Sequence, residues 1–260
     1  MIPLNRPEPG EDLERLLAAR TELLAGAGAT AASARAAWSG ARAVKRHLHS
    51  LLESMSPGIV RCMYCGDSQG TDIDHFQPIA LAPLRAFDWL NHFLACSHCN
   101  SNQKRDRYPC GEDGDCLLVD PGREDPYDHL RLVLTTGEYR ARTPKGEVTI
   151  EVFGLQRPVL TMGRAHAFVR CKSMLRDWYR LRKADEGREA REVENALRVQ
   201  PFADVLYAML RTMHRPGAQA VFTPDVLVAL HAMGAAAAGF PAQRSGERAP
   251  LTPSPSPPRD

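Results

Sequence analysis

Apolar residues recur at helical spacing in two separated parts of the chain. Between Glu11 and Leu24, leucines stand at positions 13, 16, 17, 23 and 24, which predicts an amphipathic helix. An alanine-rich segment that runs into a mixed apolar and basic one predicts a second helix from about Thr30 to Met55. The helical pattern returns after Val159 and predicts helices over roughly 159–182, 186–198, 201–214 and 224–236.

The region between Pro57 and Asp125 differs in composition and pattern. The regular spacing of apolar residues is lost, and Cys, His, Gly, Asn and Pro become frequent. Short strands are predicted around Thr71–Phe76, and also around Arg131–Tyr139 and Glu147–Phe153, where the turn-like sequence RTPKGE separates the two. The tail is rich in Pro and Ser and is expected to be disordered. We therefore expect four parts, at 1–56 (helical), 57–125 (irregular), 126–240 (short strands, then helices) and 241–260 (tail).

Composition narrows the classes of protein only a little. The chain has 260 residues and a formal net charge of +2, so no strong global field draws it to nucleic acid or to an anionic membrane. The beginning of the sequence does not have the pattern of a secretory signal, and the uncharged stretch Val226 to Gln243 is rich in Ala and Gly, which favours a core helix over a membrane span. A cytoplasmic protein without a membrane partner is expected.

Two close cysteine pairs stand 30 residues apart, Cys62-x-x-Cys65 and Cys96-x-x-Cys99. Tetrahedral zinc favours this arrangement, because each pair supplies two thiolates and two pairs complete the coordination. A redox dithiol would need one such pair near the start of a helix in a thioredoxin-like unit, and that context is missing. We expect a structural Zn²⁺ that joins the ends of the intervening segment. The predicted fold class is mainly α, with a small α+β finger held by this four-cysteine zinc site.

The remaining cysteines are less informative. Cys110 and Cys116 lie in the loop sequence PCGEDGDC, where they are either a second metal site or, as we expect, free loop thiols. Cys171 falls within a helical pattern and is expected in the core.

Between the two cysteine pairs lies the sequence TDIDHFQP, with adjacent Asp74 and His75. A carboxylate is a hard ligand suited to Mg²⁺ or Mn²⁺, and a neutral imidazole readily takes a proton near pH 7. The pair could therefore supply a metal ligand and a base. An isolated Asp-His sequence is more often a turn or surface pair. The functional interpretation therefore depends on the position of Asp74 and His75 between the two cysteine pairs.

The order of motifs then resembles a known family. The sequences DHFQP, DWLN and CSHCNSNQK, with the cysteine spacing, are similar to those of the HNH endonucleases, which contain a ββα-metal finger. The later sequences LLVDPGREDPYDHL and GLQRPVL narrow the resemblance to HNH proteins of bacterial Septu and retron-linked defence systems. The general resemblance covers about Arg61 to Arg107 and the narrower one extends to about Arg164, so 57–125 is expected to hold the nuclease finger.

The resemblance implies roles for individual residues. Asp74 would bind the catalytic metal, His75 would be the general base, and Asn91 would steady the finger loop and so orient His75. Many members place a metal-binding histidine directly after the last zinc cysteine, where this chain has Asn100. An amide oxygen suits Mg²⁺ or Mn²⁺, so Asn100 is expected to be a ligand, and the alternative is a helix cap.

Basic residues follow in the predicted helix. Lys104 and Arg105 are expected to hold phosphates beside the scissile bond, and a solvated charge run is the alternative. His92 and His98 lie near the ligands in sequence but occupy no family position, so we interpret both as structural or exposed.

These features lead to two hypotheses. The first is a metal-dependent endonuclease that hydrolyses phosphodiester bonds in DNA, with RNA not excluded, in anti-phage defence alongside an ATPase partner, as the narrower resemblance implies. The second is an inactive zinc-stabilised module that binds nucleic acid or protein. A binding module has no need of hard-metal ligands beside a base, which favours the enzyme.

Overall fold

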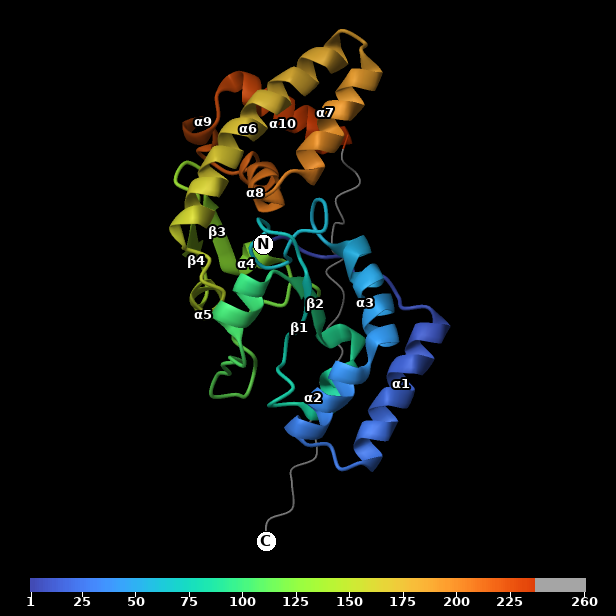
Figure 1. Cartoon of the computed structure of the whole chain (residues 1–260). Helices are drawn as coiled ribbons and strands as arrows, with labels where there is room; N and C mark the ends of the chain where they lie inside the picture. The colour runs from blue at the N-terminus through green and yellow to red at the C-terminus, as the bar shows by residue number, and fades with distance from the viewer. Residues whose placement is uncertain (237–260) are drawn as a thin grey trace.

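The computed structural model describes residues 1–236 of the chain. The predicted disordered tail at 241–260 therefore lies outside the described residues. Helices predominate, and two small two-stranded antiparallel sheets lie between an N-terminal and a C-terminal group of helices (Figure 1). The expected mainly α fold with a small mixed finger is confirmed.

The N-terminal helices are α1 (Glu11–Gly26), α2 (Ala31–Gly40) and α3 (Arg42–Met55). The helix predicted from Thr30 to Met55 is broken at Ala41, whose φ of −84° and ψ of 50° leave the helical region. Thr30 starts α2 with a capping box, in which its side chain and that of Ser33 bond to each other's backbone N–H. The break allows α2 and α3 to contact different parts of the finger, η1 and β2.

The finger contains five short elements: β1 (Asp72–His75), the 3₁₀ helices η1 (Pro83–Phe87) and η2 (Trp89–Asn91), β2 (His92–Ala95) and the π-helix η3 (His98–Lys104). Strands β1 and β2 pair antiparallel, with Asp74 opposite Phe93 and His75 opposite His92. The predicted strand at 71–76 is confirmed. Strand β2 was not predicted, because all four of its residues are buried and it shows no alternation of apolar and polar positions.

The next segment contains α4 (Pro126–His129), β3 (Leu130–Val133), β4 (Glu138–Ala141) and α5 (Pro144–Val152). A β-hairpin therefore occupies the range predicted as one strand from Arg131 to Tyr139. The strand predicted over Glu147–Phe153 is wrong, because this range belongs to α5. Its β-branched residues suggested a strand, whereas Pro144 in the first turn and a hydrogen bond from the Gly146 N–H to the Thr143 hydroxyl start a helix.

The C-terminal helices are α6 (Pro158–Lys183), α7 (Gly187–Val199), α8 (Ala203–Thr212), α9 (Ala218–Val221) and α10 (Pro224–Ala236). Helix α6 packs against α7, α8 and α10 (Figure 1). The four predicted helices are confirmed, and the short α9 was not predicted. The described part of the stretch from Val226 buries Val226, Ala229, Leu230 and Met233, as a core helix does. No helix within residues 1–236 is long and apolar enough to cross a membrane.

The C-terminal helices contact the finger at a cysteine turn. Gly66 follows Cys65 with a φ of 69°, a conformation that favours glycine, and its carbonyl accepts a hydrogen bond of 2.8 Å from the Phe202 N–H. Phe202 itself has a φ of 65° and its side chain is buried. This hydrogen bond joins the turn that holds Cys62 and Cys65 to the start of α8.

Candidate functional site

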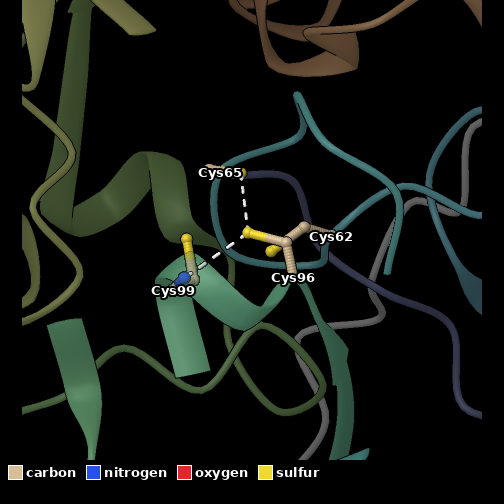
Figure 2. A group of neighbouring side chains, drawn as sticks. All are labelled: Cys62, Cys65, Cys96 and Cys99. Carbon is tan, nitrogen blue, oxygen red and sulfur yellow. Dashed lines mark hydrogen bonds between the residues drawn. The ribbon is translucent and has the colours of Figure 1, made fainter. Parts of the chain in front are cut away.

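Four cysteine side chains converge on one point (Figure 2). The sulfur atoms of Cys62, Cys65, Cys96 and Cys99 all lie within 4.8 Å of one another, and all four residues are buried. A tetrahedral zinc ion with Zn–S bonds of about 2.3 Å places its sulfurs about 3.8 Å apart. The Sγ atoms of Cys65 and Cys96 are 4.0 Å apart, so the cluster fits zinc with little adjustment.

The surroundings of this cluster also favour a cation. Burial raises the pKa of the Cys62 thiol well above its ordinary value, so a group of buried thiolates is unfavourable without a positive charge among them. The Arg157 guanidinium reaches the Cys99 sulfur at 3.7 Å but cannot balance four thiolates. A bound zinc ion would deprotonate the thiols and supply that charge.

Strand β1 directs Asp74 towards the helix η3, where the carboxylate is fully engaged. One oxygen accepts a hydrogen bond of 2.5 Å from the Tyr64 hydroxyl, and the other lies 3.0 Å from the Lys104 ammonium. Lys104 also donates to the His75 carbonyl at 2.7 Å, and its side chain is 0% exposed. The buried ion pair with Asp74 argues against the expected contact of Lys104 with a phosphate, and that contact stays a prediction.

Asp72 lies two residues before Asp74, on the same face of β1. Its carboxylate is 3.4 Å from the amide nitrogen of Asn100, and neither residue is buried. These oxygen donors fit a hard cation such as Mg²⁺, whereas each oxygen of the buried Asp74 already has one partner, Tyr64 or Lys104. The role of Asp74 as a ligand stays a prediction. Asp72 was not predicted as a site residue, although the alternation of side chains along the strand DIDH places it on the face of Asp74.

The alternative role of Asn100 as a helix cap does not match its position. Helix η3 begins at His98, so Asn100 is its third residue, and its side chain contacts Asp72 on β1. A cap would precede the helix and accept from backbone N–H groups. The side chain of Asn100 is therefore available as an oxygen donor.

His75 faces the opposite side of β1 from Asp74. Its Nε2 lies 3.0 Å from the Ala86 carbonyl, which can only accept, so Nε2 carries a proton and Nδ1 is the free acceptor of the neutral ring. Burial lowers the pKa of His75 below its ordinary value. The ring is therefore neutral near pH 7, the state that a general base requires.

The rings of Trp38 and His92 pack against His75. Trp38 of α2 meets the His75 ring edge-on, with ring centres 4.5 Å apart, and stacks on His92 at 5.1 Å. His92 is buried, its Nε2 also lies 3.1 Å from the Ala86 carbonyl, and burial lowers its pKa well below the ordinary value. These contacts support the structural role expected for His92, which packs on Trp38 and shares the Ala86 carbonyl with His75. Nothing in the sequence around Trp38 indicated its contact with His75.

Asn91 fastens the loop between the two strands of the finger. Its side-chain oxygen accepts from the Gln77 N–H at 2.7 Å, and its nitrogen donates to the carbonyls of Gln77 and Arg85 at 3.0 and 3.1 Å. Arg85 precedes Ala86, whose carbonyl holds His75. These contacts support the predicted role of Asn91, because they fix the carbonyl that orients the His75 ring.

Two residues near the end of the finger are exposed. Arg105 follows η3 with a φ of 52°, and its Nε donates to the Ser101 carbonyl at 3.2 Å. Its predicted contact with phosphate stays a prediction. His98 is also exposed and lies beside Gln103, in agreement with the interpretation that it has no part in the site.

Comparison with known proteins relates part of the chain to one family and one relative. Residues 62–106 match the family model described as HNH endonuclease. The chain is 29% identical over 147 residues to the Septu protein PtuB of Bacillus mycoides (strain KBAB4), a match that covers 45% of this chain. The match spans 49% of the relative, about half of its length. No solved structure matches the chain.

Proposed function

We propose that this chain, whose residues 62–106 match the HNH endonuclease family model and which is similar to a Septu protein, is a metal-dependent endonuclease that hydrolyses phosphodiester bonds in DNA. The observation that carries the proposal is the placement of a neutral His75, with Nδ1 free, on the same short strand as Asp72 and Asp74. Helix η3 brings Asn100 to the acidic face of that strand.

In this proposal, His75 acts as the general base. Its Nδ1 takes a proton from the attacking water, while the Ala86 carbonyl holds the ring through Nε2. The positive charge that results is stabilised by the nearby carboxylate of Asp74, which raises the pKa of His75 against the effect of burial. Lys104 limits that effect and also fixes the backbone, since its ammonium binds both Asp74 and the His75 carbonyl.

The divalent cation would be held by Asn100 and by carboxylate oxygens of β1, from Asp72 and, after exchange of Lys104, from Asp74. A bound Mg²⁺ or Mn²⁺ supplies charge stabilisation to the phosphate oxygens during hydrolysis. The amide and carboxylate donors favour such a hard ion over Zn²⁺, which the sulfurs select. The two kinds of site are thus assigned to different ions by their donor atoms.

We further propose that the protein acts in the cytoplasm, in anti-phage defence, together with an ATPase partner. The similarity to a Septu protein supports this assignment. The formal net charge of +2 gives the chain little general attraction to DNA, so a partner that retains DNA near the site would complement it. Arg105 is the exposed residue that we assign to phosphate contact.

A zinc-stabilised binding module without activity is the second candidate. It is favoured by one observation, the engagement of both Asp74 oxygens by Tyr64 and Lys104, which leaves that carboxylate as a structural group. The two candidates differ in their need for a second metal. A binding module needs only zinc, whereas the enzyme also needs a divalent ion that binds oxygen.

The experiment is plasmid cleavage with the zinc-loaded chain, with and without any ATPase encoded beside it. We expect nicking or linearisation with Mg²⁺ or Mn²⁺ and none after removal of those ions under conditions in which the measured zinc content is unchanged. Retention of DNA without cleavage, in both the presence and the absence of the ATPase, would favour the binding module and contradict the proposal.

A further inference from the structure

The loop from Pro109 to Leu117 places two cysteines directly opposite each other. Cys110 and Cys116 pair in an isolated antiparallel bridge, outside the named strands. The hydrogen bonds that flank the pair run from the Gly111 N–H to the Asp115 carbonyl and from the Leu117 N–H to the Pro109 carbonyl, each at 2.9 Å. Both bonds join the neighbours of the cysteines, and the cysteine backbones do not bond to each other. Cys110 and Cys116 are therefore a non-hydrogen-bonded pair.

The position in the bridge sets the separation of the two side chains. In a non-hydrogen-bonded antiparallel pair, the Cα atoms are about 4.5 Å apart and the side chains approach each other on one face. A disulfide accepts Cα separations of about 4.4–6.8 Å. The backbone around Cys110 and Cys116 therefore already has the spacing that a disulfide requires, and no rearrangement of the loop is needed.

Neither cysteine is fully buried, and the pair is not part of a metal site. Cys110 is exposed and Cys116 is half-buried. Within residues 1–236, the zinc-cluster cysteines are the only group of three or more His, Cys, Asp or Glu side chains placed to hold a metal ion together. Two thiols with no further ligand fall short of the four that structural zinc takes, so the second metal site considered from the sequence has no support.

We propose that Cys110 and Cys116 form a thiol–disulfide pair that hydrogen peroxide oxidises. The Cys110 thiolate attacks one peroxide oxygen and becomes a sulfenic acid while the O–O bond breaks, and the other oxygen leaves as water after taking up the thiol proton. The Cys116 sulfur then attacks the sulfenic sulfur, an S–S bond forms, and a second water leaves with the Cys116 proton. Two thiols and one peroxide thus give one disulfide and two waters.

The surroundings assign the order of these steps. Burial raises the pKa of Cys116, so its thiol stays protonated longer, and the exposed Cys110 is the group that a dissolved peroxide meets first. Cys116 also lines a cavity of about 470 Å³ that Phe76 and Arg85 of the finger loop share. Tyr108 contacts Phe76 edge-on with ring centres 5.8 Å apart. The pair therefore borders the finger, but its oxidation does not depend on the proposed nuclease activity.

Tryptic peptides make the test specific, because each group of cysteines falls in a different peptide. The peptide from Tyr108 to Arg123 contains Cys110 and Cys116 and no other cysteine. The zinc-cluster cysteines fall in two others, Cys62 to Arg85 and Ala86 to Lys104. Alkylation after denaturation, followed by mass spectrometry, then reports the state of each group separately.

The full zinc-loaded chain is treated with hydrogen peroxide, and untreated chain and a Cys116→Ser variant serve as controls. We expect the Tyr108–Arg123 peptide of the treated wild type to lose both alkyl labels and regain them after reduction with dithiothreitol, while the two zinc peptides keep theirs. In Cys116→Ser, no disulfide forms within this peptide. Retention of both labels in the treated wild type would overturn the proposal, as would disulfides that join Cys110 or Cys116 to the zinc cysteines or to a second chain.

Discussion

The finger and the C-terminal helices bury different kinds of side chains. The helices α6, α8 and α10 pack mainly through apolar residues, and α6 and α8 each bury one charged side chain, Arg164 and Asp204. The finger instead buries Asp74, Asn91, His92 and Lys104, each with side-chain hydrogen bonds or an ion pair to another part of the finger. A polar interior is stable only when its groups are paired. The paired polar groups therefore fix the geometry around His75, and we expect the finger to tolerate substitution of these groups poorly.

The largest expected difference between the two regions concerns zinc. Replacing one ligand, Cys99→Ser, should remove the ion and unfold the finger, because structural zinc sites contribute about 10–16 kcal/mol of apparent binding free energy. Zinc content, near-UV circular dichroism and far-UV circular dichroism measure the effect. We expect the first two signals to be lost while most helical signal remains.

The matched control for this prediction is Cys110→Ser, which changes an exposed thiol outside the cluster and should keep the zinc. Loss of the helical signal in Cys99→Ser would show that the helices depend on the finger. In that case the contrast between the two regions would fail.

The second prediction concerns the buried ion pair. Lys104→Met leaves the buried Asp74 carboxylate without its counter-charge, and removal of one partner of such a pair costs about 3–5 kcal/mol. The next residue provides a control, since Arg105 is exposed and Arg105→Met should change the free energy of unfolding by less than about 0.5 kcal/mol. Urea unfolding measures both.

The salt dependence of DNA binding should distinguish Lys104 from Arg105 in the reverse order, with the larger effect at Arg105. Arg105→Met should reduce the slope of log K against log salt by about 0.9 if it loses one phosphate contact. Lys104→Met, measured under conditions in which it is folded, should leave that slope unchanged. A reduced slope for Lys104→Met alone would return Lys104 to the role of a phosphate ligand.

The third prediction concerns the loop between the strands. Asn91→Ala removes the partners of one N–H and two carbonyl groups, and each unsatisfied buried group costs about 1–3 kcal/mol. We expect a free energy of unfolding lower by about 2 kcal/mol or more. Asn102→Ala, an exposed change in the same finger, should have little effect. Equal stability of the two variants would show that Asn91 does not fasten the loop.

The smallest predicted effect is at the contact between the finger and the N-terminal helices, where Trp38 of α2 packs on His75 and His92. Aromatic pairs contribute about 0.5–1.5 kcal/mol beyond the area that they bury. Trp38→Ala should therefore destabilise the chain modestly and lower the cleavage rate, whereas Trp38→Phe keeps a ring and should restore most of that rate. A rate equally low in Trp38→Phe and Trp38→Ala would contradict support of His75 by ring packing.

The contrast between the regions also explains what could be predicted from the sequence. Helices α1, α6 and α10 follow a repeating apolar pattern, which tertiary packing reinforces. The zinc cysteines were predicted from spacing alone, because a tetrahedral ion needs two convergent pairs. Strand β2 is only four residues long and wholly buried, so it lacks the alternation of apolar and polar residues that would predict a strand. The strand expected over Glu147–Phe153 failed because the start signal at Thr143 and Pro144 outweighs β-branched side chains.

The candidate site was predictable only as far as local motifs reach. Adjacent Asp74 and His75 indicated the chemistry, but the partners of each come from distant segments. Tyr64 and Lys104 engage Asp74, and Trp38 contacts His75 across a sequence separation that no motif spans. The burial of Lys104 could not be predicted for the same reason, since a lysine in a basic run is expected to be exposed until the fold shows its carboxylate partner.

The measurement that tests the account most directly is the DNA cleavage rate of His75→Ala against that of His98→Ala, at matched zinc content and thermal stability. His98 is an exposed histidine beside the same zinc cysteines and has no assigned role. Loss of a general base typically reduces the rate by about 10²–10⁴-fold, so His75→Ala should fall by this factor while His98→Ala cleaves like the wild type. Cleavage by His75→Ala at the wild-type rate would contradict the assignment of the site.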